Sequence, residues 1–122
     1  MCYIIGIVGC RSRDTNEDFK LVERKFLDLY NEEKGVIVCS GGCPKGGDRF
    51  AKLLHKKYCV PYLEFPANWV KYGKRAGYIR NHDIAIRSDI LIACVSPNRT
   101  GGTEHTIKEF IEFHEEKDLH IV

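Results

Sequence analysis

Hydrophobic and polar positions follow two patterns that alternate along the chain. Short, continuously apolar runs, of which Tyr3-Ile4-Ile5-Gly6-Ile7-Val8 is the first, are typical of parallel strands covered on both faces. Between these runs, apolar side chains recur every three or four residues, which predicts amphipathic helices. The runs predict strands at 3–8, 36–39, 60–65, 89–95 and 120–122.

The periodic segments have residues at their ends that favour helix capping or helix termination. Residues 66–77 show no periodicity and are expected to form a long loop, a feature that is usually functional in a compact domain. The predicted helices run from Thr15 or Asn16 to Gly35, over 50–58, over 78–87, and from a cap at Thr103 to 113.

The alternation of strands and helices predicts the fold class. It favours an α/β fold, a single-domain Rossmann-like three-layer sandwich that spans residues 1–122 and has a mainly parallel sheet of about five strands. Ligands bind beyond the carboxyl ends of the strands in such sheets. Met1 to Cys10 is expected to be a buried strand rather than a signal peptide, because it lacks a basic start. No run approaches the ~18 apolar residues of a membrane helix, so no membrane association is expected.

Composition narrows the function classes. With 122 residues, 43% hydrophobic and 30% charged, the chain can bury a core of its own. Its formal net charge of +2 is too small to indicate a nucleic-acid coat or a membrane-surface protein. The six cysteines lie mostly in or beside predicted strands, which indicates buried thiols and a reducing, cytoplasmic setting.

The stretch from Ser40 to Asp48, Ser-Gly-Gly-Cys-Pro-Lys-Gly-Gly-Asp, is the strongest candidate for chemistry. It joins a β-branched run to a helix, and its glycines allow backbone N–H groups to approach a ligand closely. The spacing matches neither the dinucleotide fingerprint nor the P-loop. We interpret the stretch as an anion cradle; a glycine-rich turn that binds nothing is the alternative.

Basic residues gather in the segments that leave the carboxyl ends of the predicted strands. A second glycine turn, Gly101-Gly102, belongs to the same rim. A basic, glycine-lined crevice attracts small anions, and Arg offers bidentate geometry to phosphate. The alternative is that these loops are charged only because they are solvated. The rim is made by Arg11, Arg13, Lys45, Arg49, Lys71, Lys74, Arg75, Arg80 and Arg99.

Motifs spread over nearly the whole chain fall in the order and spacing of one known family. They are Gly9-Cys10-Arg11-Ser12-Arg13, Ser40 to Asp48, Trp69 with Tyr72-Gly73-Lys74 and Ala76-Gly77, Ile79-Arg80-Asn81, Asp89, and Gly102-Thr103. In these motifs the chain resembles the YspA-like, cpYpsA-related branch of the SLOG superfamily. That superfamily also contains the LOG-type nucleotide phosphoribohydrolases and the DNA-processing protein DprA.

The resemblance implies a Rossmann-like protein that binds a small phosphorylated, nucleotide-like ligand, as a sensor or as an enzyme. It implies that the 40–48 loop and the turn at 101–103 hold phosphate and ribose, while Arg11 and Arg80 approach the ligand. A homodimer is open, because dimers are common in the superfamily. The expected binding residues are Gly9, Arg11, Ser12, Arg13, Ser40, Gly41, Gly42, Gly46, Asp48, Trp69, Arg80, Asn81, Gly101, Gly102 and Thr103.

The resemblance leaves catalysis open. LOG-type enzymes use an arginine, matched here by Arg80, and a glutamate after a Gly-Thr pair, whose position Thr106 occupies. Glu104 lies two residues earlier, a rotation of about 200° along a helix. We therefore favour a sensor or accessory binder; the alternative is a hydrolase that uses Arg80 with Glu104 or Asp48.

Other chemistries have weaker support. Cys39 and Cys43 with His82 or His105 lack zinc-site spacing, so no metal and no cofactor are expected. Trp69 either stacks on a base or caps a core edge. DprA-like binding of single-stranded nucleic acid is a third candidate, disfavoured by the small net charge and the lack of an aromatic series.

Overall fold

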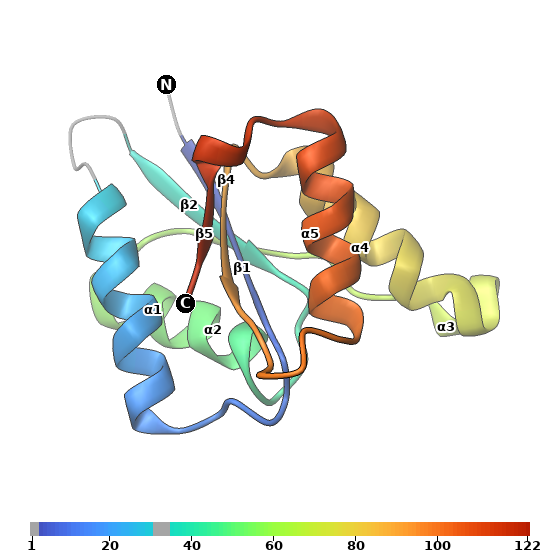
Figure 1. Ribbon diagram of the computed structural model, residues 1–122, viewed down its shortest axis with the longest axis horizontal. Coiled ribbons are helices and arrows are strands. Elements are labelled where there is room, and N and C mark those ends of the chain that lie inside the picture. Colours follow the sequence, from blue (N-terminus) through green and yellow to red (C-terminus); the bar gives the residue numbers. More distant parts are fainter. Residues whose placement is uncertain (1–2, 31–34) are drawn as a thin grey trace.

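The computed structural model describes residues 3–30 and 35–122 and shows a five-stranded parallel sheet flanked by helices (Figure 1). The strands lie in the order β3-β2-β1-β4-β5, which confirms the predicted Rossmann-like sandwich. The strands are β1 (Tyr3–Gly9), β2 (Val36–Ser40), β3 (Tyr62–Glu64), β4 (Ile90–Cys94) and β5 (Leu119–Ile121). The helices are α1 (Asn16–Leu29), α2 (Gly47–Tyr58), α3 (Trp69–Tyr72), α4 (Ala76–Arg87) and α5 (Gly102–Phe113), with 3-10 turns η1 (Gly73–Arg75) and η2 (Glu116–Asp118).

A separate hydrophobic cluster fills each face of the sheet. Ile5 and Ile7 of β1 are fully buried in the cluster that α1 and α2 complete. Val8 belongs to the opposite cluster, completed by α4 and α5, because successive side chains of a strand point to opposite faces. Continuous apolar runs therefore identified these strands correctly.

The order of the strands places a crevice at the centre of the sheet. From β1 the chain winds outward through β2 to β3, and it then returns to the other side of β1 to form β4 and β5. The adjacent strands β1 and β4 end together, with Gly9 paired to Cys94. Because the crossovers on the two sides of this point run in opposite directions, the loops after β1 and β4 diverge and leave space for a ligand.

The helix ends correct part of the sequence prediction. Thr15 caps α1 as predicted, with the N–H of Asp18 donating to Oγ1 of Thr15 at 3.1 Å. This helix ends at Leu29, before the predicted end at Gly35, and residues 31–34 lie outside the described residues. Thr103 is not a cap: it lies in the first turn of α5, and Gly101 occupies the N-cap position with a φ of 98°. The prediction for Thr103 was wrong because only glycine adopts this φ readily.

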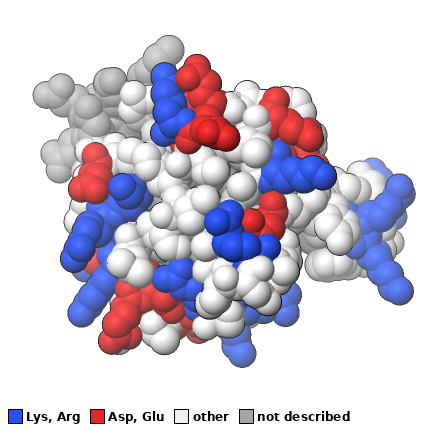
Figure 2. Space-filling model, viewed as in Figure 1, with Lys and Arg blue, Asp and Glu red and all other residues white. Residues whose placement is uncertain are grey.

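The long loop expected at 66–77 contains regular structure. Asn68 caps α3 by accepting a hydrogen bond from the N–H of Lys71 at 3.0 Å, and α4 already begins at Ala76. The end of the molecule labelled α3 projects from its body (Figure 1), and in Figure 2 Lys and Arg side chains mark this projection. A helix of four residues is too short to show periodicity, which is why the prediction missed it.

Candidate anion-binding site

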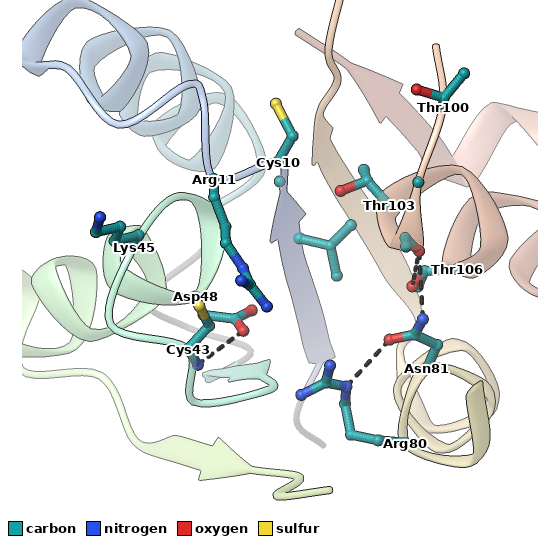
Figure 3. A pocket seen from close by; sticks show the side chains of 14 residues that line it. Cys10, Arg11, Cys43, Lys45, Asp48, Arg80, Asn81, Thr100, Thr103 and Thr106 are labelled. Carbon is teal, nitrogen blue, oxygen red and sulfur yellow. Dashed lines mark hydrogen bonds between the residues drawn. The ribbon is translucent and has the colours of Figure 1, made fainter. Parts of the chain in front are cut away.

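A cavity of about 400 Å³ opens at the carboxyl ends of β1 and β4, between the N-termini of α2 and α5 (Figure 3). It combines two glycine turns with cationic side chains from three separate segments. The residues that line it are Val8, Gly9, Cys10, Arg11, Cys43, Lys45, Asp48, Arg80, Asn81, Thr100, Gly101, Gly102, Thr103 and Thr106.

Glycines bring the start of α2 into contact with the end of β1. Gly46 has a φ of 73°, and a Cβ there would lie 2.5 Å from the carbonyl oxygen of Cys10. A Cβ on Gly47 would lie 2.3 Å from the nitrogen of Gly9 and 2.3 Å from the carbonyl carbon of Val8. Any larger residue would push α2 off the strand, so the glycine pair fixes the distance between this helix N-terminus and the cavity.

Asp48 organises the loop that precedes α2. Its Oδ1 accepts a hydrogen bond from the N–H of Gly41 at 3.2 Å and lies against the hydroxyl of Ser40. Its Oδ2 accepts from the N–H of Cys43 at 2.9 Å (Figure 3). Both carboxylate oxygens are thus engaged within the loop, and Asp48 holds the cradle in shape.

Three glycines and a serine of the predicted site are not among the residues that line the cavity. Ser40 is fully buried, and its hydroxyl lies 2.8 Å from the carbonyl oxygen of Ile7. Gly42 has a φ of 84°, and a Cβ there would lie 2.6 Å from the carboxyl carbon of Glu64. Gly41 and Gly46 are buried as well. These residues shape the loop backbone and do not contact the cavity directly.

Arg80 links α4 to the cradle. Its Nη1 donates to the carbonyl oxygen of Gly41 at 3.1 Å, and its Nε donates to Oδ1 of Asn81 at 3.1 Å (Figure 3). A Cβ on Gly41 would lie only 2.4 Å from Nη1, so glycine is required for this approach. The guanidinium has five N–H donors, and those not used in these two bonds are available to a ligand.

Arg11, in the loop after β1, and Lys45, in the loop before α2, add further positive charge to the cavity. Arg11 forms no hydrogen bond or ion pair with another described residue, and Figure 3 shows its guanidinium extending into the cavity near Asp48. Lys45 also lines the cavity, and its charge helps to lower the pKa of Asp14, which is not a lining residue. Among the lining residues Asp48 alone is acidic, so the three cations dominate the charge of the cavity.

The first turn of α5 forms the opposite wall. Gly102 and Thr103 line the cavity, and the first N–H groups of a helix have no partner within the helix. The carbonyl of Gly102 accepts from Nδ2 of Asn81 at 3.3 Å and from Oγ1 of Thr106 at 3.1 Å. These two bonds hold the turn in place while its N–H groups remain available to an anion.

Arg13, predicted to bind the ligand, does not line the cavity. Its Nε pairs with Asp18 at 2.9 Å, and its Nη1 donates to the carbonyl oxygens of Val95 at 3.0 Å and Val122 at 2.6 Å. Arg13 thus joins the loop after β1 to the residues after β4 and β5. Its role in the structure is to close the edge of the sheet.

Ser12 and Arg49 also lie outside the lining. Ser12 is exposed, with its hydroxyl 3.3 Å from Sγ of Cys10. Arg49 binds Asp14, with Nε donating to Oδ1 at 2.7 Å. The N–H of Gly46 donates to the same carboxylate at 2.7 Å, and together these bonds hold the pKa of Asp14 below its ordinary value of 3.8. Asp14 therefore supports the N-terminus of α2 from outside.

Glu104 and Trp69 are separated from the cavity lining. Glu104 forms an ion pair with Nε of Arg99 at 2.9 Å, whereas Thr106, buried one turn into α5, lines the cavity. Trp69 is 59% exposed on the projecting α3. The structure therefore groups Asp48 with Arg80 but does not bring Glu104 to them.

Several lining residues were absent from the predicted site. Cys10 and Cys43 lie within loops that the sequence had identified, so their positions beside the glycines were a usable signal. Lys45 had been predicted as part of the basic rim but not as a binding residue. Thr106 follows Gly102 by four residues, which puts it on the same face of the helix. Thr100 and Val8 carry no such signal, because a threonine in a loop and a valine in a strand are ordinary.

Comparison of the chain with protein-family models, with curated proteins and with solved structures finds no match. Within residues 3–30 and 35–122, no group of three or more His, Cys, Asp or Glu side chains could hold a metal ion. No helix in that part of the chain has the length and apolar character needed to cross a membrane.

Proposed function

We propose that the cavity binds a small phosphorylated, nucleotide-like metabolite and that the protein acts as a sensor or accessory binder. The observation that carries the proposal is the convergence of two glycine turns, each at a helix N-terminus, with Arg11 and Arg80 in one cavity. Helix N-termini and guanidinium groups are both favourable partners of phosphate oxygens. The volume of about 400 Å³ lies within the range of small-molecule sites.

Binding is better supported than hydrolysis. N-glycosidic cleavage needs a carboxylate that stabilises an oxocarbenium-like centre or activates water. Asp48 is the one acidic residue among the lining residues, and both of its oxygens are engaged in the 40–48 loop. Thr106 stands where the LOG-type glutamate is expected, and Glu104 pairs with Arg99 instead. No specific observation favours nucleic-acid binding.

Thermal unfolding with a panel of ligands tests the proposal. The panel contains AMP, cytidine and guanosine monophosphates, ADP-ribose and NAD, with adenosine as the control that lacks phosphate. We expect one or more phosphorylated ligands to raise the Tm, adenosine to leave it unchanged, and chromatography to detect no released base. Absence of any shift at millimolar concentrations would contradict the proposal.

Two variants assign the effect to the cavity. Arg80→Ala should weaken binding by about 1.5 to 3 kcal/mol, the contribution of a charge-assisted hydrogen bond. Glu104→Ala should leave affinity unchanged, because this side chain does not line the cavity. Base release by the wild type that Glu104→Ala abolishes would instead establish the hydrolase.

A further inference from the structure

A second cavity, of about 320 Å³, is lined by residues of η1, α4 and α5. In it the carboxylate of Glu109 lies between two imidazoles. Oε1 of Glu109 is 3.2 Å from Nε2 of His105, and Oε2 is 3.3 Å from Nδ1 of His82. The proposed binding function leaves these groups unused. The cavity is lined by Arg75, Tyr78, Ile79, His82, His105 and Glu109.

A chain of side-chain contacts joins this cavity to the anion site. Nδ1 of His105 lies 3.3 Å from Nδ2 of Asn81. Oδ1 of Asn81 accepts from Nε of Arg80 at 3.1 Å, and Arg80 in turn donates to the carbonyl of Gly41 at 3.1 Å. Asn81 is 8% exposed, so water has little access to replace a bond that it loses.

The ends of this chain fix the direction of every hydrogen bond in it. The guanidinium of Arg80 can only donate, and the carbonyl of Gly102, 3.3 Å from Nδ2 of Asn81, can only accept. The amide of Asn81 therefore has one orientation, in which an N–H faces Nδ1 of His105. That nitrogen must be the acceptor, so the proton of neutral His105 lies on Nε2 and is donated to Glu109.

We propose that His105 is a positioning residue that makes anion binding depend on its protonation; the proposal rests on the function proposed above. Protonation of Nδ1 places an N–H against the N–H of Asn81. If the Asn81 amide turns to accept that proton, its N–H₂ meets Nε of Arg80 and its oxygen meets the carbonyl of Gly102. The first outcome breaks the contact between His105 and Asn81. The second also removes the bond from Nε of Arg80 to Asn81, one of the two hydrogen bonds that hold Arg80 in the position that it needs to bind phosphate.

Protonation of His105 should change the anion affinity in the opposite direction to that expected from charge attraction alone. The charged and titratable groups that line the cavity with His105 are Glu109 on its own helix, Tyr78 and His82 on α4, and Arg75 of η1. Protonating either histidine adds positive charge near the anion site, which by Coulomb attraction alone would tighten anion binding by about a factor of two. The proposed relay, which is the series of hydrogen bonds from His105 through Asn81 to Arg80, instead weakens anion binding in acid.

The test measures the affinity of the full chain for sulfate, whose charge is constant in this range, by calorimetry between about pH 5.5 and 8. Acidification through the range where imidazole titrates should weaken sulfate binding about fivefold or more. His105→Gln presents a carbonyl acceptor that does not titrate and should remove the dependence. His82→Gln, which keeps the bond between His105 and Asn81, is the matched control and should retain it, with thermal unfolding confirming that both variants are folded.

The outcomes separate this proposal from the one on which it rests. Failure of sulfate and of every phosphorylated ligand of the panel to bind at pH 8 would overturn the binding function and the pH dependence together. Binding at pH 8 that stays constant or tightens in acid would overturn the relay alone. The same holds if His105→Gln keeps the wild-type pH profile, or if His82→Gln loses it.

Discussion

Gly41→Ala should weaken ligand binding while leaving the fold largely intact. The added Cβ would lie 2.4 Å from Nη1 and 2.8 Å from Cζ of Arg80, and 3.0 Å from Oδ2 of Asp48. The closest atoms belong to the end of a long side chain, so Arg80 can move away without a shift of the backbone. The φ of Gly41 is not positive, so alanine is compatible with the backbone there.

The magnitudes follow from the contacts that change. Displacing the guanidinium of Arg80 from the cavity should cost about 1.5 to 3 kcal/mol of binding free energy, roughly a 10- to 150-fold increase in Kd. Losing the bond from Arg80 to Gly41 costs about 1 to 2 kcal/mol of stability, and replacing glycine returns about 0.4 to 1 kcal/mol through the unfolded state. The net loss of about 1 kcal/mol lowers Tm by a few degrees.

Calorimetric titration with the best ligand of the panel, together with urea unfolding, measures both quantities. The double variant Gly41→Ala/Arg80→Ala should bind no more weakly than Arg80→Ala, because both changes remove the same contact. Gly77→Ala is the control: its Cβ would meet Trp69 at 3.4 Å, and affinity should not change. Full affinity in folded Gly41→Ala, or additive losses in the double variant, would refute this reasoning.

Two further predictions concern the loop and the thiols. The pKa of Asp14 is lowered by the hydrogen bond from Gly46 and by Arg49, so its contribution to stability is complete above the ordinary value of 3.8 and is lost as pH falls below it. Asp14→Asn should therefore be less stable than wild type at pH 7 in urea unfolding, and the difference should shrink in acid; a constant difference would contradict this. Ligand binding should slow alkylation of Cys10 and Cys43, read by peptide mass spectrometry, but not that of exposed Cys59. Equal protection of all three thiols would argue against a localised ligand.

The sheet and the convergence of the two glycine turns could be predicted because both follow from chain order. Parallel strands that alternate with helices bring their carboxyl ends together, so Gly46 and Gly101 had to lie at the same end of the strands, although the helices that they precede cover opposite faces. The close contact of Gly46 and Gly47 with the end of β1 could also be anticipated, since close backbone contact is the usual reason for a glycine pair before a helix.

Which arginines face the cavity could not be predicted. Arg13 does not line the cavity because it binds elsewhere, in part to the carbonyl of Val122. Val122 lies 109 residues away in sequence, and no local pattern reveals such a partner. Arg99 instead binds Glu104, only five residues away in the first turn of α5. The sequence does not show whether two opposite charges at this separation form an ion pair. The side chain that reaches the ligand is decided by competition among acceptors in three dimensions.

Buried thiols were predicted for the strands, and β2 and β4, the two strands beside β1, contain them as Cys39 and Cys94. Burial raises the pKa of Cys39 and of Cys94 to about 11. Cys10 and Cys43 differ because they leave the strands and enter the cavity wall. The sequence could not separate these two classes, since the ends of strands are defined only to within a residue or two.

A phosphate group should bind between the N-termini of α2 and α5. A crystal structure of the protein with AMP, or with the nucleotide that raises Tm most, would locate it. We expect the phosphate in the 400 Å³ cavity, within hydrogen-bond reach of Arg11 and Arg80. A nucleotide bound elsewhere, with this cavity holding only water, would contradict it.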